Sequence, residues 1–278
     1  MRVLITGGHG QLGRALQQAL REHEVLAPGH AELDVTDPAV IERALAGFRP
    51  EAVIHAAAWT DTAGCEADPQ RALLVNGEGT RLVAEACRDV GAVMLYVSTN
   101  EIFDGEKREP YTEADEPNPL NSYGRSKLAG ERYVQAVLAR YYIVRTAWLY
   151  GAGRVSFPEK VLQAADKSGA LKGVTDEIAS PTWVADLAGG IAGLLWSAPP
   201  GVYHLTNGGH CSRLEWMVEI LRLANRSDVK VEPATQAEFD LPYRKPVCSA
   251  LSLQKAGRCG IEMPPWPDAL ARYMAKSE

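Results

Sequence analysis

The sequence predicts an α/β fold built on a doubly wound parallel sheet, with a smaller C-terminal lobe. Short runs rich in Val, Ile and Leu alternate with segments of helical periodicity up to about residue 206, which is typical of βαβ units. A glycine-rich turn directly follows the first of these runs. Beyond residue 224 the alternation is broken by prolines at positions 233, 242, 246, 264, 265 and 267, so this end of the chain is expected to form the lobe.

The predicted elements follow one another in a regular order. Strands are expected at residues 2–6, at 24–27, in a short segment ending at Leu33, and at 52–56, 93–98, 142–145 and 202–205. The runs at 52–56 and 93–98 are almost continuously apolar, as expected of strands buried on both faces. Helices are expected at 11–22, 122–138, 158–167, 182–196 and 212–224. Two more are expected between the strands: one begins at Asp37-Pro38, and a separate long helix ends near Val90. Ser212 and Glu215 form a capping-box pattern at the start of the helix expected at 212–224.

The composition is that of an ordinary globular protein, and its charge excludes some partners. The chain carries 29 Lys and Arg against 35 Asp and Glu, without a basic run, so nucleic acid is not an expected partner. No apolar run approaches the ~18 residues of a membrane span, and the apolar start is too short for a signal peptide. We therefore expect a cytoplasmic protein with no membrane partner.

Histidine and cysteine spacing predicts neither a metal site nor a disulfide. The six histidines show no ligand spacing, so no metal is expected. The five cysteines are odd in number and widely separated, and they are predicted to be buried and reduced; they are Cys65, Cys87, Cys211, Cys248 and Cys259.

A glycine-rich turn, from Gly7 to Gly13, joins the first predicted strand to the first helix. Its G-x-G-x-x-G spacing lets the chain turn sharply and approach a pyrophosphate at the helix N-terminus. Directly after a strand, this pattern predicts a dinucleotide site in a Rossmann-type domain. The second strand ends in Ala27-Pro28-Gly29-His30, without an acidic residue, which favours NADPH. Glu32 and Asp34 lie close enough in the sequence to keep NADH open as the cofactor.

These observations give a domain division. Residues 1–150, together with about 181–206, are expected to form the dinucleotide-binding Rossmann domain. Residues of about 151–180 and 207–278 are expected to form a substrate-binding lobe. A chain of this length can bury roughly 75% of the surface that it exposes when unfolded, which is enough for a large domain with a smaller lobe.

A tyrosine, a lysine and a threonine are expected to meet at the edge of the sheet. Tyr123 and Lys127 are four residues apart near the start of the helix predicted at 122–138, so their side chains share one face. Thr99 closes the strand predicted at 93–98, where ligands of open α/β folds bind. A nearby ammonium group lowers the pKa of a tyrosine from its free value of ~10 by favouring phenolate. The three groups predict a carbonyl-reducing site.

With these motifs, the chain resembles the extended short-chain dehydrogenase/reductase superfamily and, within it, the dTDP-4-dehydrorhamnose reductase family. The resemblance covers nearly the whole chain, and the run Pro119-Leu120-Asn121 that leads to Tyr123 is its most specific part. The other matching segments are 6–13, 34–37, 56–58, 75–80, 98–99, 103–105, 122–131, 145–146, 148–151, 180–182 and 186–188.

The resemblance implies an oxidoreductase that passes hydride from a nicotinamide cofactor to the C4 ketone of a dTDP-linked 4-keto-6-deoxy sugar, in the biosynthesis of deoxysugars such as dTDP-rhamnose. By motif position, Tyr123 would be the general acid, Lys127 would hold the nicotinamide ribose, and Thr99 would orient the carbonyl. The implied cofactor contacts, besides Tyr123 and Lys127, are Gly7, Gly10, Gln11, Leu12, Gly13, Asp34, Val35, Ala56, Ala57 and Ala58. The implied substrate contacts are Thr60, Asn100, Glu101, Trp148 and Lys245. The expected partner is a nucleotide sugar, and the formation of a homodimer is left open.

The chain departs from the family pattern mainly on the substrate side. Asn100-Glu101 stand where the family usually has Asp-Tyr, Thr62-Ala63 where it has Val-Asp, Lys245 where it has Arg, and Ser156 where it often has Asn. Lysine lacks the planar guanidinium that suits a phosphate, and Glu101 brings a charge where an aromatic ring is usual. The sequence therefore leaves open which sugar is reduced. It also leaves open a non-catalytic regulatory subunit like the β subunit of methionine adenosyltransferase, and a nucleotide-sugar epimerase.

Four other polar or aromatic residues have structural interpretations. His55 ends a buried strand and is expected to be a hydrogen-bonded core residue. Asn76 lies within a predicted helix and is expected to support the strand ends near the active site. Trp59 is expected to pack at the rim, whereas Trp148 lies just past a strand end and fits ligand stacking as well as packing.

Overall fold

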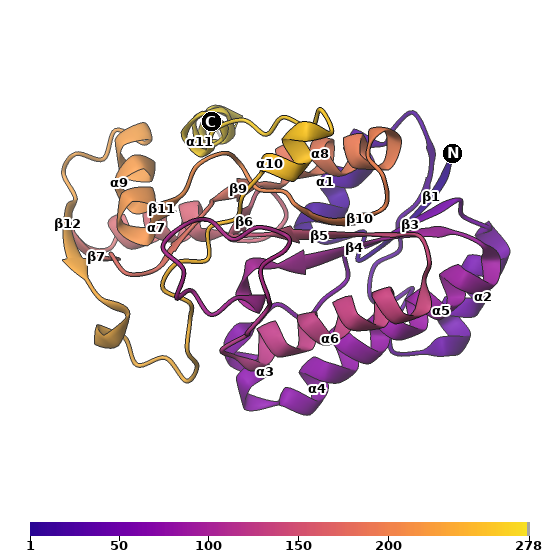
Figure 1. Ribbon diagram of the computed structural model, residues 1–278. Coiled ribbons are helices and arrows are strands. Elements are labelled where there is room, and N and C mark those ends of the chain that lie inside the picture. The colour runs from indigo at the N-terminus through magenta and orange to yellow at the C-terminus, as the bar shows by residue number, and fades with distance from the viewer. Residues whose placement is uncertain (277–278) are drawn as a thin grey trace.

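The computed structural model describes residues 1–276 and has a six-stranded parallel sheet at its centre (Figure 1). The strand order is β10-β5-β4-β3-β1-β2. The strands are β1 (Arg2–Thr6), β2 (Glu24–Leu26), β3 (Ala52–His55), β4 (Val93–Thr99), β5 (Tyr141–Thr146) and β10 (Gly201–His204). The chain leaves β1 for β2 on one side and later returns to β3 on the other. The order of the strands thus reverses beside β1, and such a reversal opens a ligand crevice at the carboxyl ends of the strands.

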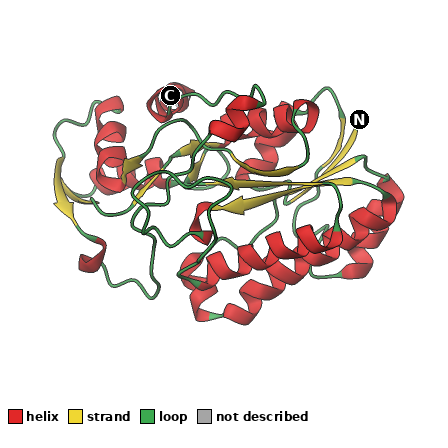
Figure 2. Cartoon of the chain, in the orientation of Figure 1, coloured by secondary structure: helices red, strands yellow, loops and turns green. Residues whose placement is uncertain are grey.

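Helices cover both faces of this sheet (Figure 2). One face is covered by α2 (Pro38–Phe48), α5 (Gly79–Val90) and α6 (Ser122–Val137). The opposite face is covered by α1 (Gln11–Ala19) and α8 (Val184–Ser197). The strands are buried on both sides, and all four residues of β3 are buried, as their continuous apolar runs predicted. The fold class predicted from the sequence, a Rossmann-type α/β fold, is confirmed.

A second group of elements lies beyond the carboxyl ends of the strands, at the left of Figure 1. It contains α7 (Phe157–Ala165), α9 (Arg213–Leu223), and the parallel pair β7 (Ala170–Val174) and β12 (Lys230–Ala234). A short antiparallel pair, β8 (Ile178–Ala179) and β11 (Cys211–Ser212), leads into α9. The predicted capping box is present: the Ser212 hydroxyl accepts from the Glu215 N–H at 3.1 Å, and the Glu215 carboxylate accepts from the Ser212 N–H at 2.7 Å.

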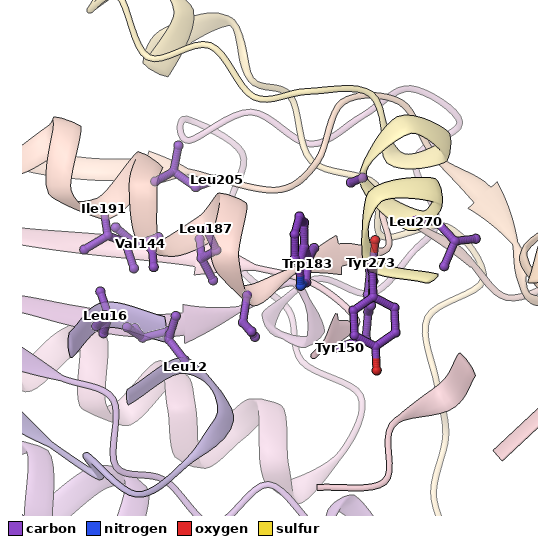
Figure 3. Close-up of a cluster of buried hydrophobic side chains, with 14 of the residues drawn as sticks. Leu12, Leu16, Val144, Tyr150, Trp183, Leu187, Ile191, Leu205, Leu270 and Tyr273 are labelled. Atoms are coloured by element: carbon purple, nitrogen blue, oxygen red, sulfur yellow. The ribbon is translucent and has the colours of Figure 1, made fainter. Parts of the chain in front are cut away.

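One hydrophobic cluster connects these two groups of elements. Figure 3 shows Leu12 and Leu16 of α1 facing Leu187 and Ile191 of α8. The same cluster continues through Tyr150 and Trp183 to side chains of the C-terminal helix α11 (Trp266–Lys276), of which Leu270 and Tyr273 are labelled. The core between the central sheet and α1 and α8 is therefore continuous with the core around α9 and α11.

The remaining elements are short and connect the longer ones. α3 (Thr62–Ala67), α4 (Pro69–Leu73) and a π-helical turn (Leu74–Glu78) precede α5, and a 3₁₀ turn (Asn100–Ile102) follows β4. β6 (Leu149–Tyr150) pairs with β9 (Thr182–Trp183). A second 3₁₀ turn (Gln236–Glu238) follows β12, and α10 (Gln254–Arg258) precedes α11. None of the helices described in residues 1–276 has the length and apolar character needed to span a membrane.

The structure corrects several predicted elements. The strand expected to end at Leu33 is a turn, in which the N–H groups of Glu32 and Leu33 both donate to the Gly29 carbonyl. Leu33 is buried, so the apolar signal reported burial and not a strand. The helix expected at 11–22 ends at Ala19. The helix expected at 182–196 begins at Val184, because residues 182–183 form β9.

The proline-rich end and the cysteines also differ in part from expectation. Prolines that were expected to break the pattern lead into α11, whose second residue is Pro267, because proline fits a first helical turn. Cys65, Cys87 and Cys211 are buried as predicted, but Cys248 and Cys259 are only half-buried.

Candidate active site

A cavity of about 660 Å³ opens at the carboxyl ends of the central strands. The glycine turn before α1 forms one end of it, and Arg213 and Trp216 of α9, with Lys245 from the segment after β12, form the other. The end of β4 and the first turns of α6 line the wall between them. The cavity therefore lies where the strand order predicted a ligand crevice.

The glycine turn has the geometry that a pyrophosphate site requires. Gly7 has φ of +69°, which favours glycine. A Cβ on Gly8 would lie 2.1 Å from the Ala27 carbonyl oxygen, and one on Gly13 would lie 2.4 Å from the Gly7 carbonyl oxygen. Gly10 caps α1 without a side-chain hydrogen bond, so N–H groups of the first turn can donate to an anion at the cavity. The residues present fit a dinucleotide.

The structure brings most, but not all, of the predicted cofactor residues to this cavity. Its wall includes Gly7, Gly10, Gln11, Leu12, Gly13, Ala56 and Ala58. Asp34, Val35 and Ala57 are not part of that wall. The Asp34 carboxylate accepts from the N–H and the hydroxyl of Thr36 at 2.9 and 2.8 Å, and the backbone hydrogen bond is the main cause of its lowered pKa. Asp34 thus orders the turn before α2.

An acidic side chain does reach the turn after β2. Glu32 Oε2 accepts from the Gly29 N–H at 2.7 Å and lies 3.6 Å from Nε2 of His9. Glu32 was one of the two residues expected to reach the adenosine. Glu32 therefore lies beside the glycine turn, near the end of the site where the adenosine was expected.

Thr99, Tyr123 and Lys127 meet in the wall of the cavity, as predicted. Lys127 is 2% exposed. Its Nζ donates to the Val97 carbonyl at 2.8 Å and lies 4.2 Å from the centre of the Tyr96 ring. Burial lowers the pKa of Lys127 to about 7, and the charge of Glu131 opposes this shift.

The surroundings of Tyr123 favour the neutral phenol. Burial raises its pKa above the ordinary value, and the Glu101 carboxylate raises it further. A hydrogen bond with Thr99 and the charge of Arg154 act in the opposite direction and lower the pKa. The predicted lowering of this pKa by Lys127 is therefore wrong: burial dominates, and the pKa of Tyr123 rises. A neutral phenol is the form that a proton donor needs.

Close packing of α6 against the end of β4 holds these groups together. Asn121 caps the helix, because its Oδ1 accepts from the Gly124 N–H at 2.8 Å. A Cβ on Gly124 would lie 2.2 Å from the Glu101 carbonyl oxygen, and one on Gly130 would lie 2.4 Å from the Tyr96 hydroxyl. Glycines at these two positions therefore let the helix approach the strand closely enough to place Tyr123 beside Thr99.

The five predicted substrate contacts all lie in the cavity wall, but their side chains are engaged differently. Thr60 accepts from Nη1 of Arg154 at 3.3 Å. Asn100 Nδ2 donates to the Ser249 hydroxyl at 2.6 Å and accordingly supports the C-terminal segment. Glu101 accepts from Asn121, as described below.

Lys245 and two residues that the sequence did not single out form an ion-pair cluster. Glu177 accepts from Arg213 at 2.9 and 3.1 Å and from Nζ of Lys245 at 3.0 Å. Burial raises the pKa of Glu177, but the two cations outweigh it, so that the pKa lies below its ordinary value. Arg213 and Glu177 are 36 residues apart, and no local motif marks either of them.

Trp148 forms part of the same wall. Its φ is +44°, a strained value for a residue with a side chain. The Arg213 guanidinium lies 3.6 Å from the centre of its ring, and the Trp216 ring is stacked against it at 5.5 Å. Trp148 therefore packs against its neighbours, which is the first of its two interpretations. It also lines the cavity, so ligand stacking, the second interpretation, stays open.

Two buried polar residues behind the cavity have the structural roles predicted for them. His55 lies between the hydroxyls of Thr6 and Thr80, at 2.7 and 3.1 Å. Burial lowers its pKa to about 3, and the charge of Lys127 adds to this. Asn76 binds both backbone groups of Trp59, at 2.8 and 3.0 Å, and the Ser126 hydroxyl at 3.0 Å. It ties the segment after β3 to α6. Trp59 is outside the cavity wall and packs under the Arg71 guanidinium.

Comparisons with known proteins show the family to which the chain belongs. The family model of the RmlD substrate binding domain matches residues 1–278. The dTDP-4-dehydrorhamnose reductase of Streptomyces griseus is 41% identical over 269 residues, which cover 94% of this chain and 88% of that protein. The crystal structure of a dTDP-4-dehydrorhamnose reductase from Clostridium acetobutylicum has a TM-score of 0.97 at 37% identity and covers 100% of this chain and 99% of that one. For the dTDP-4-dehydrorhamnose reductase of Bacillus anthracis in complex with NADP, the TM-score is 0.95 at 36% identity, with 99% of each chain covered. The chain therefore belongs to the RmlD substrate binding domain family, the family of dTDP-4-dehydrorhamnose reductases that its motifs resemble.

Proposed function

We propose that this protein reduces the C4 ketone of a dTDP-linked 4-keto-6-deoxy sugar with NADPH as the hydride donor. The observation that carries the proposal is the meeting of Thr99, Tyr123 and Lys127 in one cavity with the glycine turn. Relatives named as dTDP-4-dehydrorhamnose reductases support the substrate class. The NADP complex of the Bacillus anthracis relative supports the cofactor.

Each of the three residues has a task in this mechanism. When bound, the nicotinamide supplies the hydride that adds to the carbonyl carbon. The Thr99 hydroxyl binds and orients the carbonyl oxygen. Tyr123 donates its phenolic proton to that oxygen as the C–O double bond becomes a single bond, and the phenolate then regains a proton from solvent. General-acid catalysis of this kind contributes ~10²–10⁴ in rate. Lys127 holds the nicotinamide ribose.

Residues of the cofactor end would bind the rest of the dinucleotide. Backbone N–H groups of Gln11 and Leu12 at the start of α1 would bind the pyrophosphate. The Gln11 side chain is not free for this task, because its Nε2 donates to the Gly151 carbonyl at 2.6 Å. Ala56 and Ala58 would border the adenosine side. We assign the sugar nucleotide to the opposite end, between Trp148 and Lys245.

We also propose the finer features that the sequence predicts. The protein would act in the cytoplasm, with about 151–180 and 207–278 as its substrate-binding lobe. A homodimer is the assembly to test first, by light scattering during size-exclusion chromatography. The division into domain and lobe leaves one shared core, as Figure 3 illustrates.

The direct test is oxidation of NADPH, followed by its absorbance, with a panel of dTDP-4-keto-6-deoxy sugars. Turnover that is lost in Tyr123→Phe would support the proposal and identify the sugar. Conversion of a sugar without net consumption of cofactor would indicate an epimerase. Tight NADPH binding without turnover of any sugar would favour the regulatory-subunit alternative.

A further inference from the structure

Glu101 is an acidic residue in the same cavity wall as the groups that would carry the reaction. Glu101 follows Thr99 by two residues, and its N–H donates to the Thr99 hydroxyl at 3.2 Å. Its side chain lines the cavity. It shares this cavity wall with Tyr123, the phenol that would donate the proton, and its negative charge raises the pKa of that phenol.

Glu101 has only one hydrogen-bond donor for its two oxygens among the described residues. Oε2 accepts from Asn121 Nδ2 at 2.7 Å. For Oε1 there is no donor within residues 1–276. The nearby cations Arg213 and Lys245 do not bind it, because both are paired with Glu177.

The Glu101 carboxyl group is half-buried, and leaving one of its oxygens without a protein donor costs free energy, because partial burial disfavours a charge. Burial raises the pKa of Glu101, and the charge of Glu177 acts in the same direction. A donor brought by the ligand would remove this cost. A phosphate group cannot do so, since it is itself an anion, whereas a sugar hydroxyl can.

We propose that Glu101 determines substrate specificity by accepting a hydrogen bond from the sugar hydroxyl next to the ketone. This inference rests on the proposed function, which places the C4 ketone beside Thr99 and Tyr123. In a 4-keto-6-deoxy sugar, the neighbouring ring carbon that bears a hydroxyl is C3. The protein would therefore select substrates that carry the C3 hydroxyl over their 3-deoxy counterparts.

The test combines a change in the enzyme with a change in the substrate. We compare kcat/KM for a dTDP-4-keto-6-deoxyhexose and its 3-deoxy counterpart, in the wild-type protein and in Glu101→Leu. The wild type is expected to prefer the C3 hydroxyl on the order of 10²-fold. In Glu101→Leu, kcat/KM should fall by ~30–100-fold for the hydroxylated substrate and by less than ~3-fold for the 3-deoxy substrate.

Matched variants separate hydrogen bonding from a structural effect. Glu101→Gln retains an acceptor oxygen and should recover most of the preference for the C3 hydroxyl. Glu116→Leu replaces an exposed carboxylate and should leave both substrates unaffected. An equal loss for the two substrates in Glu101→Leu would overturn the proposal, since Glu101 would then act only through Asn121 and the position of Tyr123. If kcat/KM did not change for either substrate in Glu101→Leu, the proposal would be overturned as well.

A binding measurement keeps this inference apart from the proposed function. The alcohol products, with and without the C3 hydroxyl, are titrated by calorimetry into wild type and Glu101→Leu, and no turnover is needed. A preference for the hydroxylated product that disappears in the variant would support the role of Glu101 even if no sugar were reduced, in which case only the proposed function would fail. The absence of any preference in the wild type would overturn the role of Glu101.

Discussion

Tyr123 is held as a neutral phenol by burial and by the carboxylate of Glu101, and its hydroxyl group interacts with Thr99. A reductase needs its tyrosine in the protonated state before hydride transfer, and an enzyme working in the oxidative direction would need the phenolate. The residues around Tyr123 therefore keep its phenol in the form that proton donation to a ketone requires.

Replacement of Tyr123 tests its role as proton donor. Tyr123→Phe should lower kcat by at least ~10², because the lost hydroxyl acts mainly in the transition state. NADPH binding, measured by fluorescence titration, should change little. Near-normal turnover in this variant would remove Tyr123 from the mechanism.

Lys127 should contribute to cofactor binding as well as to turnover. Its ammonium lies at the cavity and is fixed by the Val97 carbonyl. Lys127→Met keeps the length of the side chain and removes the donor, so both the NADPH Kd and kcat should worsen by on the order of 10-fold or more. If the Kd for NADPH were unaffected, Lys127 would not hold the ribose.

The buried lysine also makes stability depend on pH. Its pKa is about 7 in the folded protein and ~10.4 in an unfolded chain. Between these values the unfolded state binds more protons, so the free energy of unfolding rises with pH, by up to ~1.4 kcal/mol per unit. The difference between wild type and Lys127→Met, measured by urea denaturation at pH 7, 8 and 9, should therefore grow in favour of the wild type. A difference that does not vary with pH would contradict the lowered pKa.

At the scale of single elements, α6 is the part that assembles the site. Gly124 touches the backbone of Glu101 so closely that a methyl group would require α6 to shift. Gly124→Ala should destabilise the protein by ~1–3 kcal/mol and should lower kcat, because the shift moves Tyr123 from Thr99. Thermal unfolding and turnover give the two readouts.

A second helix glycine provides the control for this substitution. Gly189 is exposed in α8, and a Cβ there would meet nothing within 4 Å. Gly189→Ala should stabilise the protein by ~0.5–1 kcal/mol through helix propensity and leave turnover unchanged. A loss of kcat in both variants would mean that close packing of α6 is not what positions Tyr123.

The elements that the sequence predicted well are those with a local physical cause. Strands β3 and β4 are almost continuously apolar because both faces are buried, and α9 begins at a capping box. The turn at Leu33 was wrongly predicted as a strand, since burial alone produces the same apolar run. The proline-led start of α11 was missed because proline both ends helices and begins them.

In the candidate site, too, the sequence predicted the residues with a local signal and missed those brought together by tertiary structure. Thr99, Tyr123 and Lys127 follow from a strand end and from the spacing on one helix. Arg213 and Glu177 do not, because their contact joins α9 to the residue before β8 through tertiary structure alone. The sequence also could not indicate that Glu177 occupies both cations and leaves Glu101 with a free oxygen.

At the scale of the whole molecule, the continuous hydrophobic cluster should make unfolding a single transition. Leu270 of α11 is 0% exposed and belongs to the same cluster as Leu12 and Leu16 of α1. Leu270→Ala should therefore cost ~2–5 kcal/mol and lower one common midpoint, seen alike by calorimetry and by circular dichroism. Two separate transitions, of which only one moved, would show that the lobe folds independently.

The same continuity limits how the cavity can open. Domains joined by a hinge can rotate apart to open a cavity. In this protein such a rotation would disrupt a buried cluster that includes Tyr150, Trp183 and Tyr273. Entry and release of ligands would then depend on local motion of the cavity wall, in which Phe239 and Leu241 expose about two fifths of their surface. The rate of this local opening, and not the rate of a domain rotation, would then limit product release.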